Sequence, residues 1–101
     1  GKNLINEWLE AKPTRIFVRN REDLMNVDPK NVDQLMGLFS SSHLPYNLET
    51  IRDNNEDVVP TLTDMTLKAI DILEENPEGY FLFVEGGRID HAHHGEYLRF
   101  Y

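Results

Sequence analysis

The spacing of apolar residues in the first quarter of the chain predicts a short helix followed by a strand. The helix spans residues 3–11, with Asn3 as its N-cap, and Pro13 stops it. Its apolar stripe consists of Leu4, Ile5, Trp8 and Leu9. Residues 15–19 alternate in a way typical of a short strand, and residues 21–25 suit another helical turn.

The second quarter of the chain is predicted to be mostly irregular. Residues 26–31 are polar and contain Pro29, which indicates a loop. The apolar residues within 35–39 favour a short strand, although a glycine interrupts them. Residues 40–55 are rich in polar side chains and begin with a serine run, so a long loop is expected there.

The strongest periodicity lies in residues 61–75 and predicts the longest helix. Thr61 and Asp64 have the spacing of a capping box, and residues 76–79 end the helix. The apolar run Tyr80–Val84 is too short for a helix and predicts a strand buried on both faces. A helix that leads into such a strand is typical of an α/β sheet.

Charge and cysteine content narrow the function classes. The 101 residues carry a formal net charge of −8, which argues against nucleic acid as a partner through a broad basic face. A phosphate substrate is still compatible, because bound cations reverse charge locally. The absence of cysteine excludes disulfides and thiolate metal sites within this sequence.

The N-terminus carries neither an initiator Met nor an apolar signal region, and no apolar run approaches the roughly 20 residues that span a bilayer. We therefore expect a chain that starts inside a fold, with any signal or anchor outside it.

The chemistry is concentrated in residues 85–94, E-G-G-R-I-D-H-A-H-H, which hold three of the chain's four histidines. Glu85 follows the expected strand, and ligands of α/β sheets gather at the carboxyl ends of strands. If residues 88–94 are helical, Asp90 and His94 share one face, where an oxygen and a nitrogen can reach one zinc ion. The hard oxygens of Glu85 suit magnesium better.

The roles of His91 and His93 stay open at this point, and so does an alternative to a metal site. His91 lies one residue off the Asp90 face, and His93 points elsewhere, so His93 is expected to be structural or to support a ligand. A carboxylate at a helix start also favours the helix dipole without any metal, and its spacing to His94 is common by chance. Spacing alone does not separate a metal site from a solvated helix start.

Residues 81–94 resemble the metal-ligand segment of animal alkaline phosphatases. The similarity extends over residues 1–95, through Gly1–Leu4 with Glu7–Leu9, Asn20–Met25, Leu35–Phe39 and Pro60–Asn76. It implies an α/β fold, as part of a three-layer architecture with a central, mostly parallel sheet. Residues 40–49 look closer to insect members, and residues 96–101 are expected to be a divergent tail.

The resemblance implies hydrolysis of phosphate monoesters through a phosphoserine intermediate, with two zinc ions and one magnesium ion. By that similarity, Glu85 matches a magnesium ligand, and Asp90 and His94 match two ligands of one zinc. His91 matches a position that contacts the substrate phosphate through water. Arg88 matches no ligand, so an ion pair or a helix-start contact is expected for it.

Several family parts are expected to lie outside this sequence. The only serines, Ser40–Ser42, do not stand in the Asp-Ser-Ala setting of the nucleophile, so no catalytic residue is assigned and the chain alone is expected to be inactive. The alternative to a part of an alkaline phosphatase is a noncatalytic, truncated paralogue that binds metal or a partner. A generic metal-binding module would require the match over residues 81–94 to be accidental.

Other expectations follow from the family. Vertebrate members bind calcium in the region matching residues 39–59, but Ser40 and Val59 replace two acidic positions, which argues against a calcium site. The nearby Asp53, Glu56 and Asp57 are expected to form a solvated loop. The family further implies a homodimer at the cell surface, held to the membrane only through a lipid anchor outside this sequence.

Overall fold

The computed structural model describes residues 1–95, and the expected tail at residues 96–101 lies outside the described residues. Helices and strands alternate along the first part of the chain, and helices follow. The elements are α1 (Leu4–Glu10), β1 (Arg15–Val18), α2 (Arg21–Asn26), the 3-10 helix η1 (Pro29–Asn31), β2 (Gln34–Gly37), α3 (Asn47–Arg52), α4 (Leu62–Leu73) and α5 (Ile89–His94).

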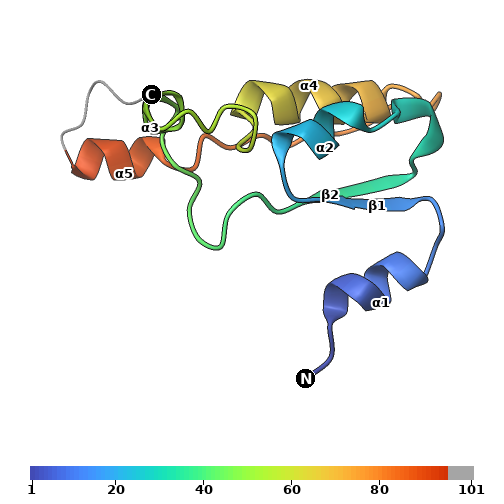
Figure 1. The fold of residues 1–101 in the computed structure, drawn as a ribbon. Helices are drawn as coiled ribbons and strands as arrows, with labels where there is room; N and C mark the ends of the chain where they lie inside the picture. Colours follow the sequence, from blue (N-terminus) through green and yellow to red (C-terminus); the bar gives the residue numbers. More distant parts are fainter. Residues whose placement is uncertain (96–101) are drawn as a thin grey trace.

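The two strands form a parallel sheet in register from Arg15 opposite Gln34 to Val18 opposite Gly37. Parallel neighbours require a crossover, which α2 and η1 supply here. Figure 1 shows α2 and α4 on one side of this ribbon and α1 on the other, with α3 and α5 displaced to one end. This arrangement is consistent with the predicted α/β class.

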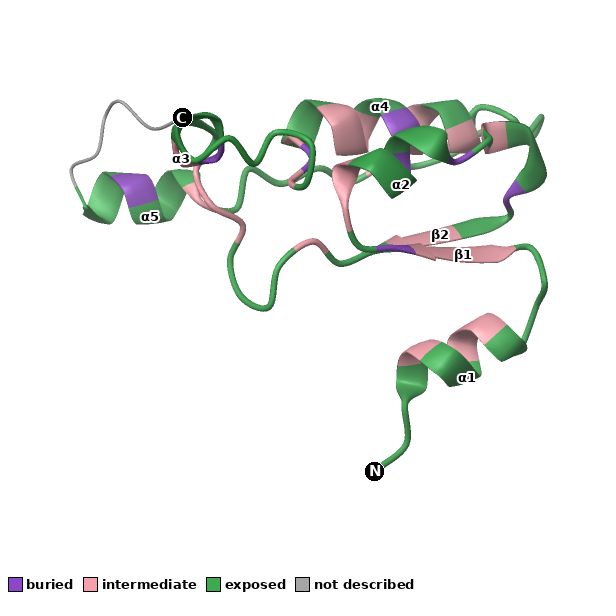
Figure 2. Ribbon diagram, in the orientation of Figure 1, coloured by how far each residue is buried: buried purple, intermediate pink, exposed green. Residues whose placement is uncertain are grey.

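The hydrophobic core lies between the sheet and the layer formed by α2 and α4 (Figure 2). Its buried side chains come from β1, α2 and the segments that flank η1. They are Val18, Leu24, Val27 and Val32, and partly buried side chains of Ile16, Leu35, Phe39, Met65 and Ile72 pack against them. Helix α1 contributes no buried residue, so it lies outside this core.

The predicted helix caps are confirmed. The Asn3 side chain accepts a hydrogen bond from the Asn6 backbone N–H at 3.2 Å. At the start of α4, the Thr61 hydroxyl accepts from the Asp64 N–H at 3.0 Å, and the Asp64 carboxylate accepts from the Thr61 N–H at 3.0 Å. Each bond satisfies a backbone donor that has no partner within its helix.

Asp64 also joins α4 to α2. The Arg21 Nε donates to the Asp64 Oδ2 at 2.8 Å, and both side chains are partly buried. This hydrogen bond, opposed by desolvation and assisted by the bonds from Thr61, lowers the pKa of Asp64 from 3.8 to about 2. The carboxylate form of Asp64 is therefore favoured by folding.

Asp64→Asn is expected to lower stability at pH 7, because it removes the charge that Arg21 and Thr61 recognise. The folded pKa lies below the unfolded value of 3.8, so the contribution is complete above that pH and is lost as pH falls through about 2. Urea unfolding of both forms at several pH values should show their difference shrinking over this window. Asp71→Asn, exposed on the same helix, is the matched control. A difference that is constant with pH would contradict this assignment.

Lys68 makes a second link between α4 and α2. Its side chain is buried, and its Nζ donates to the backbone oxygens of Val27 at 2.8 Å and Met25 at 3.2 Å. Carbonyls at the end of a helix lack partners within the helix, and a lysine placed there satisfies them. The crossover segment is thus held to α4 by a buried cation.

Lys68→Met should preserve most of the apolar packing but leave the Met25 and Val27 carbonyls without this donor. We expect a loss of about 1–3 kcal/mol in the free energy of unfolding, measured by urea denaturation. Lys30→Met, on an exposed residue, is the control and should change stability by less than about 0.5 kcal/mol. Equal effects of the two substitutions would show that the Lys68 hydrogen bonds contribute nothing.

One predicted strand is wrong. Tyr80–Val84 forms no strand, and its aromatic side chains are not buried: Phe81 is 86% and Phe83 is 76% exposed. A strand forms only where a neighbour completes its backbone hydrogen bonds, and within residues 1–95 only β1 and β2 pair with each other. Glu85 consequently does not stand at the end of a paired strand.

The loop expected over residues 40–55 contains a short helix that was not predicted, α3. The Glu49 carboxylate accepts from the Tyr46 N–H at 3.0 Å at the start of this helix, and Thr50 is buried. The Tyr46–Glu49 spacing was the available signal, but tyrosine is not among the usual cap residues.

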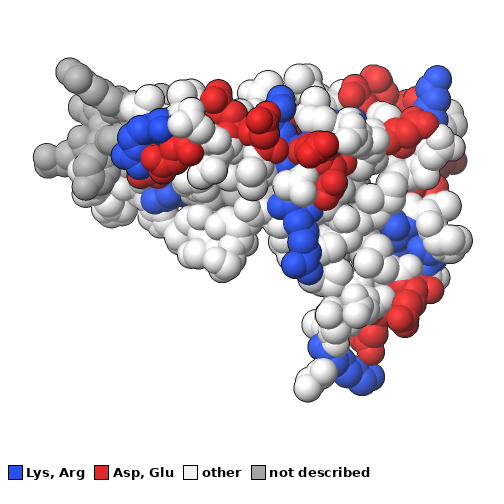
Figure 3. Space-filling view, in the orientation of Figure 1, with Lys and Arg blue, Asp and Glu red and all other residues white. Residues whose placement is uncertain are grey.

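Charged side chains cover much of the surface. On the face drawn in Figure 3, Asp and Glu gather along the upper edge, with Lys and Arg interspersed. Within residues 1–95, no helix is long and apolar enough to cross a bilayer.

Candidate metal centre

Helix α5 begins after a tight turn at Gly86 and Gly87, in which the Ile89 N–H donates to the Gly86 carbonyl at 3.1 Å. A Cβ on Gly86 would lie 2.8 Å from the Ile89 Cδ1, so a larger residue there would require the end of the Ile89 side chain to move. Ala92, on the inner face of the helix, is fully buried at 0% exposure. Helix α5, Ile89–His94, thus meets the condition on which the placement of Asp90 and His94 on one face depends.

Asp90 and His94 lie one turn apart on α5, as their spacing predicts. The His94 Nε2 is 3.5 Å from the Asp90 Oδ2, and both side chains are 78% exposed. Two ligands that each bind a tetrahedral zinc ion at about 2.0–2.1 Å are separated by about 3.3 Å. The pair thus matches the spacing of two zinc ligands and is open to solvent. The same contact also fits a surface i, i+4 pair without metal.

Glu85 does not complete a three-ligand group with this pair. No set of three or more His, Cys, Asp or Glu side chains within the described part of the chain is arranged to hold a metal ion. The Glu85 carboxylate lies beside Gly87, whose Cβ position would be 3.8 Å from the Glu85 Oε1. The chain alone brings together two of its three predicted ligands.

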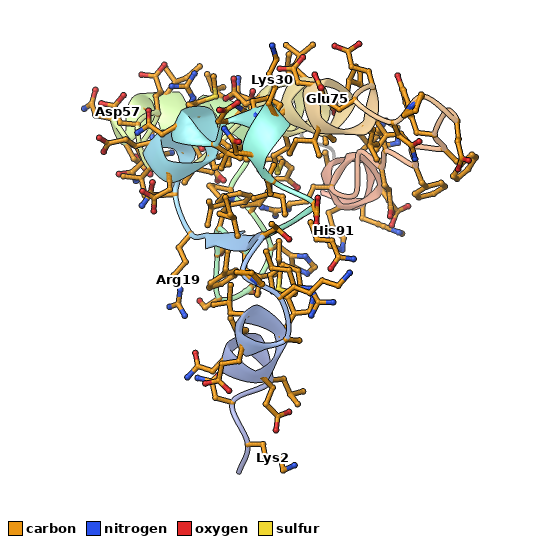
Figure 4. The ribbon with its side chains drawn as sticks, turned by 90° about the vertical axis from the view of Figure 1, so that its right-hand side faces the viewer. Lys2, Arg19, Lys30, Asp57, Glu75 and His91 are labelled. Atoms are coloured by element: carbon orange, nitrogen blue, oxygen red, sulfur yellow. The ribbon has the colours of Figure 1, made fainter. Side chains whose placement is uncertain are left out.

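His91 faces another histidine, His43, which no sequence pattern singles out. The His43 and His91 rings meet edge to face, with centroids 4.7 Å apart and an interplanar angle of 76°. His91 lies on the lower side of α5 in the view of Figure 4. Because His43 belongs to the loop before α3, the contact joins segments distant in sequence, and no local spacing could reveal it.

Arg88, at the N-cap position of α5, contacts the same loop. Its Nη1 donates to the Leu44 backbone oxygen at 2.9 Å, and its guanidinium carbon lies 3.9 Å from the centroid of the Tyr46 ring. The expected contact at the helix start is present, but it joins Arg88 to an aromatic ring and a carbonyl rather than to a carboxylate.

An apolar groove of about 530 Å³ lies between the sheet and α4, with Trp8, Phe39 and Met65 among its lining residues. None of the predicted metal ligands lines it. The groove is an extension of the hydrophobic core, and its apolar walls do not suit a phosphate group.

The sequence model of the alkaline phosphatase family matches residues 1–99. The chain belongs to the alkaline phosphatase family. An alkaline phosphatase from Gadus morhua is 45% identical over 93% of this chain and 19% of its own length. The membrane-bound alkaline phosphatase of Bombyx mori is 46% identical over 96% of the chain, and the human tissue-nonspecific isozyme is 46% identical over 93%, each over 18% of its own length.

Two consequences of these matches concern the extent of the chain. It spans about a fifth of the length of these curated alkaline phosphatases, because the matched shares are 18–19%. The family match runs to residue 99, beyond residue 95, where the resemblance was expected to stop. The insect and vertebrate relatives are about equally similar, at 45–46% identity.

The serine run and the acidic loop of this alkaline phosphatase segment have local partners. The Ser40 hydroxyl donates to the His43 carbonyl at 3.2 Å and accepts from the Ser42 N–H at 3.3 Å, which folds the loop on itself. The Asp53 carboxylate accepts two hydrogen bonds from Arg52, at 2.8 and 3.1 Å. Hydrogen bonding to Arg52 lowers the pKa of Asp53 below its usual value.

Proposed function

We propose that this chain supplies part of the metal centre of an alkaline phosphatase that hydrolyses phosphate monoesters through a phosphoserine intermediate. In this proposal Asp90 and His94 bind one zinc ion, and Glu85 binds magnesium. His91 acts on the substrate phosphate through water. The 3.5 Å separation of Asp90 and His94 on one helix face, in a chain of this family, carries the proposal.

The donor set fits zinc in chemistry and is incomplete in number. A carboxylate oxygen and an imidazole nitrogen are common zinc ligands, and catalytic zinc sites use three protein ligands with one open position. Asp90 and His94 supply two, so the remaining zinc ligands, the second zinc site and the nucleophile would come from outside these residues. When bound, the metal ions would supply Lewis-acid stabilisation of the phosphoryl oxygens.

The charge of the chain supports a requirement for cations. Its formal net charge of −8 repels a phosphate dianion, and positive ions at Glu85, Asp90 and His94 would locally reverse that repulsion. We propose that the substrate approaches the exposed side of α5, where the Asp90 and His94 side chains are open to solvent.

The remaining family properties are proposals of the same kind. The Bombyx mori relative is named membrane-bound, and we propose a cell-surface location with a lipid anchor outside this sequence. Pairing of two complete chains into a homodimer is proposed for the whole protein. No calcium ion is assigned, because Asp53 is engaged by Arg52.

Zinc titration of the chain tests the ligand assignment. We expect His94→Ala and Asp90→Asn each to weaken zinc affinity by at least about tenfold, since either change leaves a single ligand on this face of α5, and loss of a mere supporting partner of a ligand already costs that much. Zinc affinity is measured by competition with a chelating dye, and cobalt replaces zinc for detection by visible absorption. His93→Ala, on a neighbouring position of the same helix, is the control and should retain the affinity. If the His94→Ala variant binds zinc as well as the unmodified chain, His94 is not a ligand.

A turnover assay separates a partial phosphatase from an independent one. We expect the chain, supplied with zinc and magnesium, to release no p-nitrophenol from p-nitrophenyl phosphate above the rate in buffer, because Ser40–Ser42 lie in a self-bonded loop. Ser40→Ala is the control if any turnover is seen. Zinc-dependent turnover by the unmodified chain would overturn the expected inactivity. Absence of zinc binding would contradict the assignment of Asp90 and His94 as zinc ligands, whereas absence of turnover is the expected result.

A further inference from the structure

Helix α5 is too short to hold its own shape. It has six residues, whereas isolated helices of fewer than about 12–15 residues are marginal in water. Ala92 is its one buried residue within the described part of the chain. The order of α5 must therefore come from its contacts with the rest of the chain, which include the His91 ring against His43 and, at the helix start, the contacts of Arg88.

Arg88 contacts the segment before α3 through both an edge and the flat face of its guanidinium group. One edge donates from Nη1 to the Leu44 carbonyl at 2.9 Å, while the flat face covers the Tyr46 ring at 3.9 Å. The Nε is buried and has no hydrogen-bond partner within residues 1–95. A cation desolvated over an aromatic ring interacts with it more strongly than one in water.

Tyr46 is itself a fixed support. Its N–H donates to the Glu49 carboxylate at 3.0 Å, and its carbonyl accepts from the Thr50 N–H at 3.0 Å. Thr50 is buried at 4% exposure, so the start of α3 is anchored in the body of the chain. The Tyr46 ring therefore gives Arg88 a platform whose backbone is held by α3.

We propose that Arg88 is a positioning residue that fixes α5 on the Tyr46 platform and thereby sets where Asp90 and His94 are presented. Arg88 itself touches neither side chain. It acts through the helix backbone, because the Arg88 carbonyl accepts from the Ala92 N–H at 3.0 Å in the first turn. The link to metal binding rests on the proposed function, whereas the link to the order of α5 does not.

The chemistry of this contact requires arginine rather than a positive charge alone. A planar guanidinium can stack on a ring and donate from its edge at the same time. A lysine ammonium is a compact point charge, so it can make one of these contacts well but not both. The conservative change Arg88→Lys therefore separates the two roles while keeping the net charge.

The experiment measures amide hydrogen exchange of residues 89–95 in the metal-free chain, and zinc affinity in parallel. Arg88→Lys is expected to speed exchange in α5 about tenfold and to weaken zinc binding by a similar factor. Tyr46→Leu should speed exchange and weaken zinc binding by similar factors. The double variant Arg88→Lys with Tyr46→Leu should show exchange no faster, and zinc binding no weaker, than either single variant. Tyr46→Phe keeps the aromatic ring, so its amide exchange in α5 and its zinc affinity should equal those of the unmodified chain.

Arg19→Lys is the matched control, because Arg19, which directly follows β1, also lies over a ring, that of Phe17 at 5.0 Å. It should leave α5 unchanged. Unaltered exchange of residues 89–95 in both Arg88→Lys and Tyr46→Leu would overturn the proposal. Exchange in β1 that is faster by the same factor as in α5 would also overturn the proposal, because it would identify general destabilisation of the chain. If the unmodified chain binds no zinc, the proposed metal ligands fail, and exchange alone decides the role of Arg88.

Discussion

Parallel pairing of β1 with β2 sets the positions of most other elements. Two parallel strands cannot be joined by a tight turn, so the chain between Val18 and Gln34 must cross one face of the sheet. The crossover brings Leu24 and Val27 over the strands, and α4 then covers them. Arg21 and Lys68 fasten this layer at both ends of α2, through Asp64 and through the last carbonyls of the helix. The ion pair of Arg21 with Asp64 and the hydrogen bonds of Lys68 thus hold a small apolar core in place.

Helix α5, which carries the proposed zinc ligands, is attached to the rest of the chain in another way. It packs no large side chain into the main core, and its start is joined to the segment around Tyr46. The geometry within α5 is fixed by helical spacing, which sets Asp90 beside His94. The location of α5 depends instead on contacts between distant parts of the chain, among them the Arg88 guanidinium on the Tyr46 ring and the His91 ring against His43. The spacing between Asp90 and His94 and the position of α5 in the fold therefore have separate physical causes.

This separation also explains what the sequence could and could not predict. Features determined within a few residues were predicted correctly, such as the Asn3 and Thr61 caps and the Asp90–His94 pair. Contacts between distant segments, such as His43 with His91, have no local pattern. The apolar run at Tyr80–Val84 has the composition of a buried strand, yet a strand needs a neighbour, and composition does not show whether one is present. Metal binding at these residues stays a prediction.

The exposed aromatics of residues 80–84 have a consequence for the behaviour of the chain in solution. Phe81 and Phe83 present apolar rings to water on a segment that joins no sheet within residues 1–95, a combination that promotes association between copies. The net charge of −8 opposes such encounters, because each copy repels the next. Repulsion between surface charges weakens as the Debye length falls from about 30 Å at 0.01 M salt to about 3 Å at 1 M. Ionic strength therefore governs the colloidal stability of this chain, and dilute buffers keep its copies apart.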